Sequence, residues 1–461
     1  MLSSRRLITN KNKNKNKSNK HKIQTPFGKK EIVYADYAAT GLPSKIINDE
    51  LEKLYPFYAN THSNATLGQK MGEVIENVRN SVRKSFDMPR DSVVLFQGSG
   101  ASGALALLAH SISEIEDMTV FISEIEHHSN LLPWIKFDPV IVPCTANLLY
   151  IDVDAFENAL KKCKSKFKIA SFCAVSNITG VIQPVSKILE TCRKYDCKLI
   201  LDDAAGAPYI NLHFKGHARP DALVFSPHKM AGGQGAPGVL IASPCLFKAR
   251  EPFVPGGGTV RYVCKEGVEF SKQIETRESG GSPNTLGIAR LGLVLNRIKR
   301  TPLKSMSKFN IINSYLRKRF QKMEEHIKLI VPGTASIVDR VPIWSFIVAI
   351  NGKTIHYNLI VALLNDFYGI QTRGGVSCVS LYAQRIFNMK SIKLVELNML
   401  MGDKEKCGEY GWTRISFSPS TPKTTLKFIC DAIESLPQLV EKYSKNYSYN
   451  CKKNLFSFIK N

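Results

Sequence analysis

Short apolar runs that alternate with helix-like segments most limit what this chain can fold into. Five runs have the length and composition of buried strands: "VVLF" (93–96), "TVFI" (119–122), "KIASFCAV" (168–175), "KLILD" (198–202) and "ALVF" (222–225). Between them lie helical patterns over 103–116, 154–164 and 184–195. Strands that alternate with helices form a parallel sheet with helices packed on its faces. We therefore predict an α/β fold.

The pattern changes after residue 250. Gly- and Pro-rich stretches occupy 250–285, and a helix is predicted over 286–300. A Lys-rich helix over 303–327 and strands near 336–350 and 412–418 follow. We expect a large domain over 31–300, whose N-terminal segment packs partly on a smaller α+β domain over 301–440. A basic C-terminal extension is expected over 441–461.

The charge of the chain is concentrated near its N-terminus. The 461 residues have a net charge of +24, and ten of the positive charges lie in residues 1–30 without an acidic residue. The low-complexity "KNKNKNKSNK" predicts a disordered basic tail over 1–30. The preceding "MLSSRRLITN" is also typical of mitochondrial transit peptides. We expect a cytoplasmic protein, with mitochondrial import as the alternative.

Several classes of protein are not expected. No aromatic residue interleaves with the lysines over residues 1–22, which disfavours nucleic-acid binding. No window approaches about 18 consecutive apolar residues, so no membrane span is predicted. The eleven cysteines form no C-x-x-C pair, which indicates neither a zinc site nor a disulfide framework. The adjacent His127 and His128 lack a third metal ligand.

The stretch "FSPHKMAGGQGAPGVL" (225–240) contains a G-x-G-x-x-G pattern at Gly233, Gly235 and Gly238. A dinucleotide-binding loop needs a helix directly after its glycines, but here the strand-like "GVLIAS" follows. The glycines therefore indicate a turn in which the backbone passes close to its surroundings. Lys229 follows a strand and a short connection, which suits an amine that forms a Schiff base.

Three further features fit the same cofactor. Asp202 ends an apolar strand, where a carboxylate needs a positive partner such as a protonated pyridine nitrogen. Gly100, Ala101 and Ser102 begin a helix, and helix N-termini bind phosphate groups. His127 follows the strand "TVFI" and could stack on an aromatic ring. Together with Lys229, these signals predict pyridoxal phosphate.

Five motifs carry a resemblance to a known family: "EHHSNLLPW", "SNITGVIQP", "SPHK", "GGSPNT" and "RGGVSC". The chain resembles the class V (fold type I) pyridoxal-phosphate enzymes, and among them the cysteine desulfurase and selenocysteine lyase branch. The resemblance covers about residues 35–420. It implies a large domain with a mostly parallel, seven-stranded sheet flanked by helices, a smaller α+β domain, and a homodimer.

The resemblance also implies roles for individual residues. Lys229 looks like the Schiff-base lysine, His127 like the ring-stacking histidine, and Asp202 like the partner of the pyridine nitrogen. The other residues implied for the cofactor are Ser102, Ser226, His228, Asn177 and Ser282, with Ser282 acting from the second subunit. Those implied for the substrate are Arg414, which matches the α-carboxylate arginine, Asn177, Arg373 and His62. Cys378 is similar to the persulfide-forming cysteine.

The expected activity is that of a cysteine desulfurase, which converts L-cysteine to L-alanine and passes the sulfur through Cys378 to an acceptor protein. Two departures leave alternatives open. Ala205 stands where the family has a cofactor-binding glutamine, and Val376 and Ser377 replace histidines common in desulfurases. The alternatives are an aminotransferase, C–S lyase, selenocysteine lyase or epimerase with Cys378 not catalytic, or a cofactor-binding protein without turnover.

Overall fold

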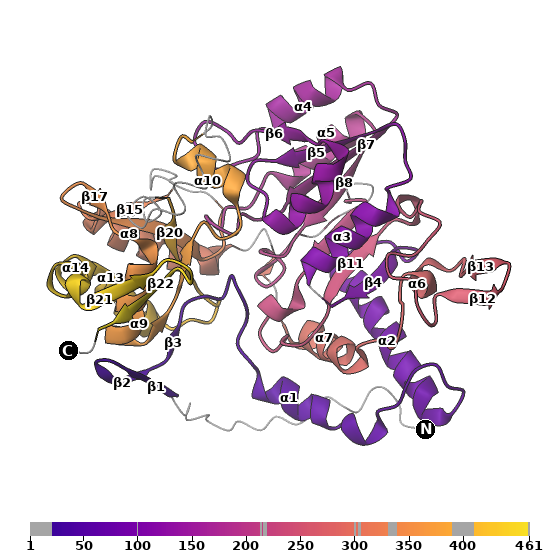
Figure 1. Ribbon diagram of the computed structural model, residues 1–461, viewed down its shortest axis with the longest axis horizontal. Coiled ribbons are helices and arrows are strands. Elements are labelled where there is room, and N and C mark those ends of the chain that lie inside the picture. Colours follow the sequence, from indigo (N-terminus) through magenta and orange to yellow (C-terminus); the bar gives the residue numbers. More distant parts are fainter. Residues whose placement is uncertain are drawn as a thin grey trace.

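A seven-stranded sheet forms the centre of the large domain (Figure 1). Its strands in spatial order are β4 (Val93–Gln97), β11 (Gly238–Ala242), β10 (Ala222–Phe225), β8 (Cys197–Asp202), β7 (Phe167–Cys173), β5 (Met118–Ser123) and β6 (Val140–Val142). Only β11 runs antiparallel to its neighbours in this sheet. The prediction of a mostly parallel, seven-stranded sheet is confirmed.

The structure is a computed structural model, and it describes residues 21–98, 100–212, 214, 219–298, 301–302, 306–330, 339–389 and 410–459. The predicted helix over 303–327 is found at Ser307–Lys322, and the strand expected near 336–350 at Ile343–Ile350. Residues 303–305 and 336–338 of these two predictions, and residues 1–20 of the expected tail, lie outside the described residues.

Both faces of the large sheet are covered because its side chains alternate between two apolar cores. In β10, Leu223 and Phe225 belong to one core, and Ala222 and Val224 to the other. The first core is closed by α2 (Thr66–Ser85), α4 (Val153–Lys162), α5 (Val185–Lys194) and α7 (Thr285–Arg297). The second is closed by α3 (Ala101–Ser111) and the 3₁₀ turns η2 (His128–Asn130) and η3 (Leu132–Phe137).

The small domain has its own sheet and its own core. Its strands are β15 (Ile327–Leu329), β16 (Ile343–Ile350), β20 (Trp412–Ser416) and β19 (Arg373–Gly375), with β17 (Lys353–Thr354) paired to β16. Its helices are α8 (Ser307–Lys322), α9 (Tyr357–Tyr368), α13 (Lys423–Glu434) and α14 (Leu436–Tyr443). Phe320 stacks on Trp344 in the core, with ring centroids 5.8 Å apart.

Both ends of the described chain fold onto this domain, which differs from the expectation of a disordered N-terminal tail. Residues 22–30 were expected to be disordered, but β1 (Lys22–Thr25) and β2 (Gly28–Glu31) form a hairpin. The hairpin is ordered because Phe27 stacks on Phe367 at 3.9 Å. The expected C-terminal extension forms a second hairpin, β21 (Tyr447–Asn450) and β22 (Leu455–Phe458), whose Phe458 ring contacts Phe27.

The segment that follows the first hairpin joins the two domains. Strand β3 (Val33–Tyr34) pairs in parallel with β18 (Ile370–Gln371) of the small domain. The chain then passes the Lys229 turn of the large domain, where the Gly41 N–H donates to the His228 carbonyl at 2.9 Å. It continues into α1 (Lys45–Glu52), which packs against α7.

The glycines after Lys229 make close backbone contacts. A methyl group on Gly233 would overlap the carbonyl oxygen of Pro227, and one on Gly238 would overlap the backbone of Gly100. The G-x-G-x-x-G pattern thus serves the packing of this turn, and the strand β11 follows it as predicted.

We therefore predict that Gly233→Ala lowers the free energy of unfolding by about 1–3 kcal/mol, the cost of an added methyl group in a filled site. Urea denaturation measures this change. The control is Gly257→Ala in an exposed loop, where a methyl group meets nothing within 4 Å and the change should stay within about 0.5 kcal/mol. Equal effects of the two substitutions would contradict the packing role.

Candidate active site

A cavity of about 250 Å³ lies at the carboxyl ends of the parallel strands, where ligands bind in α/β proteins. Both domains line it. The predicted site residues that it brings together are Ala101, Ser102, His127, Asn177, Asp202, Ser226, His228, Lys229, Arg373, Cys378 and Arg414. The sequence signals, from Ala101 to Arg414 more than 300 positions apart, therefore converge on one cavity.

Lys229 ends the 3₁₀ turn η4 (Pro227–Lys229), which follows β10. The pKa of its amine is lowered to about 8, mainly by burial; Asp202 opposes this shift, and the nearby Arg414 and Arg373 guanidinium groups add to it. A lysine with this pKa has a sizeable neutral fraction near neutral pH, whereas an ordinary lysine has almost none. Lys229 can therefore act as a nucleophile or as a base.

Asp202 is the last residue of β8, and its side chain is buried. Its Oδ1 accepts a hydrogen bond from the Ala204 N–H at 2.9 Å. Burial raises the pKa of this carboxyl, and the Ala204 N–H and Lys229 oppose the shift. A cationic group in the cavity would stabilise the carboxylate form.

The imidazole of His127 lies in the cavity wall directly after the β5 strand end. Its Nδ1 accepts a hydrogen bond from the Ser129 N–H at 3.1 Å. Burial lowers the pKa of His127 to about 4, and the positive charge of Lys229 adds to this effect. The ring is therefore neutral at physiological pH, as a group that stacks on a flat cofactor should be.

Small residues and hydroxyl groups gather at the N-terminus of α3. Gly100 has a φ of 65°, and a Cβ there would lie 3.0 Å from Ser226 Oγ. The Ala101 N–H donates to Ser226 Oγ at 2.9 Å, and Ser102 Oγ lies 2.5 Å from Ser129 Oγ. Two hydroxyl groups at the positive end of a helix dipole are suited to a phosphate.

Arg414 and Asn177 form a second cluster of polar residues in the wall of the cavity. Arg414, on β20, donates from Nη1 to the Asn177 carbonyl at 3.1 Å and from Nη2 to Asp36 Oδ1 at 3.0 Å. Its Nε is buried and, among the described residues, has no hydrogen-bond partner. The role of Asp36 was missed in the sequence; the only signal is an acidic residue directly after a short strand in "ADYAATG".

Cys378 lies on a turn with unusual backbone geometry, and its exposed thiol lines the cavity. Ser377 and Cys378 have φ values of 53° and 58°, a left-handed conformation that costs free energy for residues other than glycine. The turn is held by the His128 N–H, which donates to the Cys378 carbonyl at 2.8 Å, and by Asn177 Nδ2, which donates to the Ser377 carbonyl at 3.2 Å.

The His128 side chain also supports this turn. Its Nε2 lies 2.8 Å from the hydroxyl of Ser380, the first residue of α10 (Ser380–Ile386). The contact of His128 with Ser380, 252 positions later in the chain, could not be read from the sequence. His127 and His128 therefore serve two different parts of one site.

Besides Gly100, which is the N-cap of α3, two predicted site residues, His62 and Ser282, do not line this cavity. They line a separate cavity of about 410 Å³, where Asn60 Nδ2 donates to Ser282 Oγ at 3.1 Å. This cavity borders the segment 260–277, which consists of β12 (Val260–Cys264), β13 (Gly267–Phe270) and α6 (Ile274–Arg277). Within one chain, the structure therefore does not bring these two residues to Lys229.

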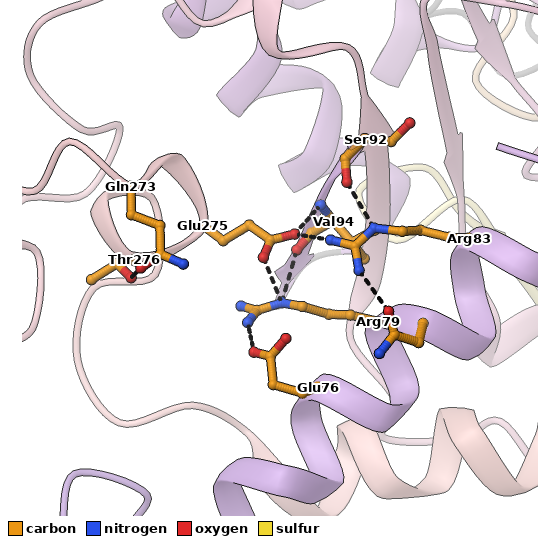
Figure 2. A network of polar contacts seen from close by, with 9 residues as sticks. Glu76, Arg79, Arg83, Ser92, Val94, Gln273, Glu275 and Thr276 are labelled. Atoms are coloured by element: carbon orange, nitrogen blue, oxygen red, sulfur yellow. Dashed lines mark hydrogen bonds and ion pairs between the residues drawn. The ribbon is translucent and has the colours of Figure 1, made fainter. Parts of the chain in front are cut away.

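An ion-pair network connects the segment 260–277 to the rest of the large domain (Figure 2). Glu275 of α6 accepts hydrogen bonds from Arg83 Nη2 at 2.6 Å and from the Val94 N–H at 2.7 Å. Arg79 of α2 lies between Glu275 and Glu76 and pairs with both. The network fixes α6, and with it the start of the loop that leads to Ser282.

Comparison with known proteins identifies the family. The family model "Aminotransferase class-V" matches residues 33–426. The chain belongs to the class V aminotransferase family. Members of this family use pyridoxal phosphate, and the chain is a pyridoxal-phosphate-dependent enzyme.

The relatives of this class V enzyme include several named proteins. It is 25% identical over 394 residues to a cysteine desulfurase of Wigglesworthia glossinidia brevipalpis, which covers 81% of this chain and 90% of that protein. It is 26% identical over 357 residues to a cysteine desulfurase of Escherichia coli O139:H28, covering 75% and 84%. The apo structure of a cysteine desulfurase from Thermococcus onnurineus NA1 shares the fold, with a TM-score of 0.71, 22% identity, and 88% and 95% coverage.

The residues of the cavity fit pyridoxal phosphate. Asp202 offers a buried carboxyl that needs a cation, and Lys229 offers an amine with a lowered pKa. The neutral His127 ring lines the same cavity. The N-terminus of α3, together with Ser102 and Ser226, offers a phosphate site, and a Cβ at Gly100 would narrow this site. Ala205 also lines the cavity. Its methyl group stands where the resemblance led us to expect a glutamine amide.

Proposed function

We propose that this class V enzyme is a cysteine desulfurase that removes sulfur from L-cysteine and carries it as a persulfide on Cys378. The observation that supports this most is the position of the Cys378 thiol in the wall of the cavity that contains Lys229. The relatives named cysteine desulfurase support the same activity. A nucleophile and a base in one cavity are what sulfur transfer requires.

The residues around Lys229 have separate roles in this proposal. Lys229 would hold the cofactor covalently, Asp202 would bind its ring nitrogen, His127 would stack on its ring, and Ser102 and Ser226 would bind its phosphate. When bound, the cofactor supplies an electron sink for charge that develops at the substrate α-carbon. The freed Lys229 amine, with a pKa of about 8, takes the α-proton and returns it.

Cys378 then acts as the sulfur acceptor. Its thiolate attacks the substrate sulfur, so that an S–S bond forms while the substrate C–S bond breaks. The carbon takes a proton and leaves as the methyl group of L-alanine, and the enzyme keeps the sulfur as a persulfide. The electron count balances without an external oxidant, because both electrons of the C–S bond remain on the carbon fragment.

A second copy of the chain completes the site in this proposal. His62 and Ser282 lie in a cavity away from Lys229, which suits residues that act on the cofactor of the other subunit in a homodimer. The persulfide is passed to a separate acceptor protein. No helix in the described part of the chain is long and apolar enough to cross a membrane. We place the reaction in the cytoplasm, with mitochondrial import through residues 1–30 as the alternative.

The direct test is to incubate the purified enzyme with L-cysteine and a reductant and to measure its products. We expect L-alanine and sulfide in equal amounts. Pyruvate and ammonia would instead show a C–S lyase, and a keto acid formed only with an amino acceptor would show an aminotransferase. Ala205 favours the C–S lyase and the aminotransferase, because the glutamine side chain expected to hydrogen-bond the cofactor is missing at this position.

The lowered pKa of Lys229 predicts a pH dependence in the cofactor-free protein. Only the neutral amine reacts with small amine-selective reagents such as cyanate, so labelling should rise with pH and reach its midpoint near the pKa of about 8. Because Asp202 raises this pKa, Asp202→Asn should shift the midpoint to lower pH. Peptide mass spectrometry measures labelling at Lys229, with exposed lysines as the internal control. A midpoint above pH 10 would contradict the prediction.

A further inference from the structure

Two arginines and one aspartate meet at the cavity wall. Arg373 and Arg414 lie directly opposite each other on the neighbouring antiparallel strands β19 and β20. Like charges in this position repel each other and destabilise a sheet. Asp36 lies between them: its Oδ1 is 3.0 Å from Arg414 Nη2, and its Oδ2 is 3.1 Å from Arg373 Nε. One carboxylate therefore offsets the repulsion of two guanidinium groups.

The backbone holds Asp36 in this position. The Ser416 N–H donates to the Ala35 carbonyl at 2.7 Å, and the Ala38 N–H donates to Ser416 Oγ at 2.8 Å. Asp36 thus lies on a short stretch that bonds to β20 on both sides, next to the strand that bears Arg414. Its carboxylate is only 12% exposed, so its contact with the buried Arg414 is screened little by water.

The charges of this group do not cancel. Two arginines and one aspartate leave one positive charge at the cavity wall. The Arg414 side chain is 4% exposed, and its buried Nε lacks a partner within the described residues, whereas Arg373 is 50% exposed near the cavity mouth. One carboxylate from a ligand would balance the remaining charge.

We infer that Asp36 determines substrate specificity: by pairing with Arg373 Nε and Arg414 Nη2, it leaves a site for amino acids with one carboxylate and disfavours those with a second acidic group. This inference rests on the proposed role of Arg414 as the α-carboxylate site. A second acidic group would compete with the Asp36 carboxylate for Arg373 and would be repelled by that carboxylate. A thiol or methyl side chain meets neither obstacle.

The test is Asp36→Asn, which keeps the size of the side chain and removes its charge. L-alanine, with one carboxylate, and L-aspartate, with two, are titrated into the cofactor-loaded enzyme while the visible absorption of the cofactor is recorded. We expect the preference for L-alanine over L-aspartate to fall about tenfold, the size of one charge-assisted contact. Asp36→Glu should keep the wild-type preference, and the double variant Asp36→Asn/Arg373→Gln should restore it.

Two further variants separate this role from a structural one. Asp221 also pairs with an arginine, Arg193, at 2.9 Å, but outside the cavity, and Asp221→Asn should leave the preference unchanged. If Asp36→Asn does not fold, Arg373→Gln gives the opposite test: it removes the net positive charge and should weaken L-alanine binding about tenfold. An unchanged preference in Asp36→Asn, or an Arg373→Gln variant that binds L-alanine as wild type does, would overturn the inference.

These titrations are independent of sulfur transfer. They record amino-acid binding, so they give a result even when the enzyme forms no alanine from cysteine. Failure of the desulfurase proposal and failure of the Asp36 inference are therefore distinguishable.

Discussion

Lys229→Ala is expected to abolish the covalent attachment of pyridoxal phosphate and to lower turnover by about 10³-fold or more, within the range for loss of a catalytic base. The lysine combines two functions that no neighbouring group can replace. It is the amine within the cavity whose pKa burial lowers to about 8, and the nearby His127 is held neutral with a pKa of about 4. Absorption spectroscopy of the purified variant measures cofactor attachment, and the alanine assay measures turnover.

The matched control is Lys198→Ala. Lys198 lies on β8 of the same sheet but pairs with Asp196 at 3.2 Å and does not line the cavity. This variant should keep the absorption band and the wild-type turnover. A Lys229→Ala protein that retains a visible band stable to dialysis would show that another residue binds the cofactor.

Cys378→Ser is expected to lower the release of L-alanine from L-cysteine by about 100-fold or more, because a hydroxyl is a far weaker nucleophile toward sulfur than a thiolate. The cofactor band should remain, since Cys378 contributes no group to the cofactor site described above. The assay is carried out with reductant present, so that regeneration of the persulfide does not limit the wild-type enzyme.

Cys245→Ser serves as the control because Cys245 is another exposed free cysteine and lies outside the cavity. It should leave the rate unchanged. A Cys378→Ser enzyme that makes alanine as fast as wild type would remove Cys378 from the mechanism and leave a C–S lyase as the better proposal. Mass spectrometry of the wild-type enzyme after brief exposure to L-cysteine should show one added sulfur on the Cys378 peptide.

Much of the large domain could be predicted because its strands are short apolar runs with clear ends. The runs at 93–96, 119–122, 198–202 and 222–225 all became strands of one sheet. Residues at the carboxyl ends of parallel strands meet at one edge, so Asp202 and Lys229 could be placed together from chain order alone.

Other parts of the site depend on contacts that no local pattern records. Asp36 reaches Arg414 only because β3 pairs with the small domain, and nothing around residue 36 indicates that pairing. His128 supports the Cys378 turn through Ser380, more than 250 positions away. The hairpin over 22–31 was missed because one aromatic side chain, Phe27, orders it through rings from distant segments.

The long-range pairing of the N-terminal segment has a consequence for the order of folding. Asp36 and Arg414 are 378 positions apart, and Thr25 Oγ1 donates to the Asp366 carbonyl across 341 positions. The seven strands of the large sheet are all synthesised before residue 243, so this sheet can form while the partners of residues 22–36 do not yet exist. Within one chain, the residues proposed to bind the cofactor from this sheet can therefore come together first during synthesis, and the half proposed to select the substrate is assembled last.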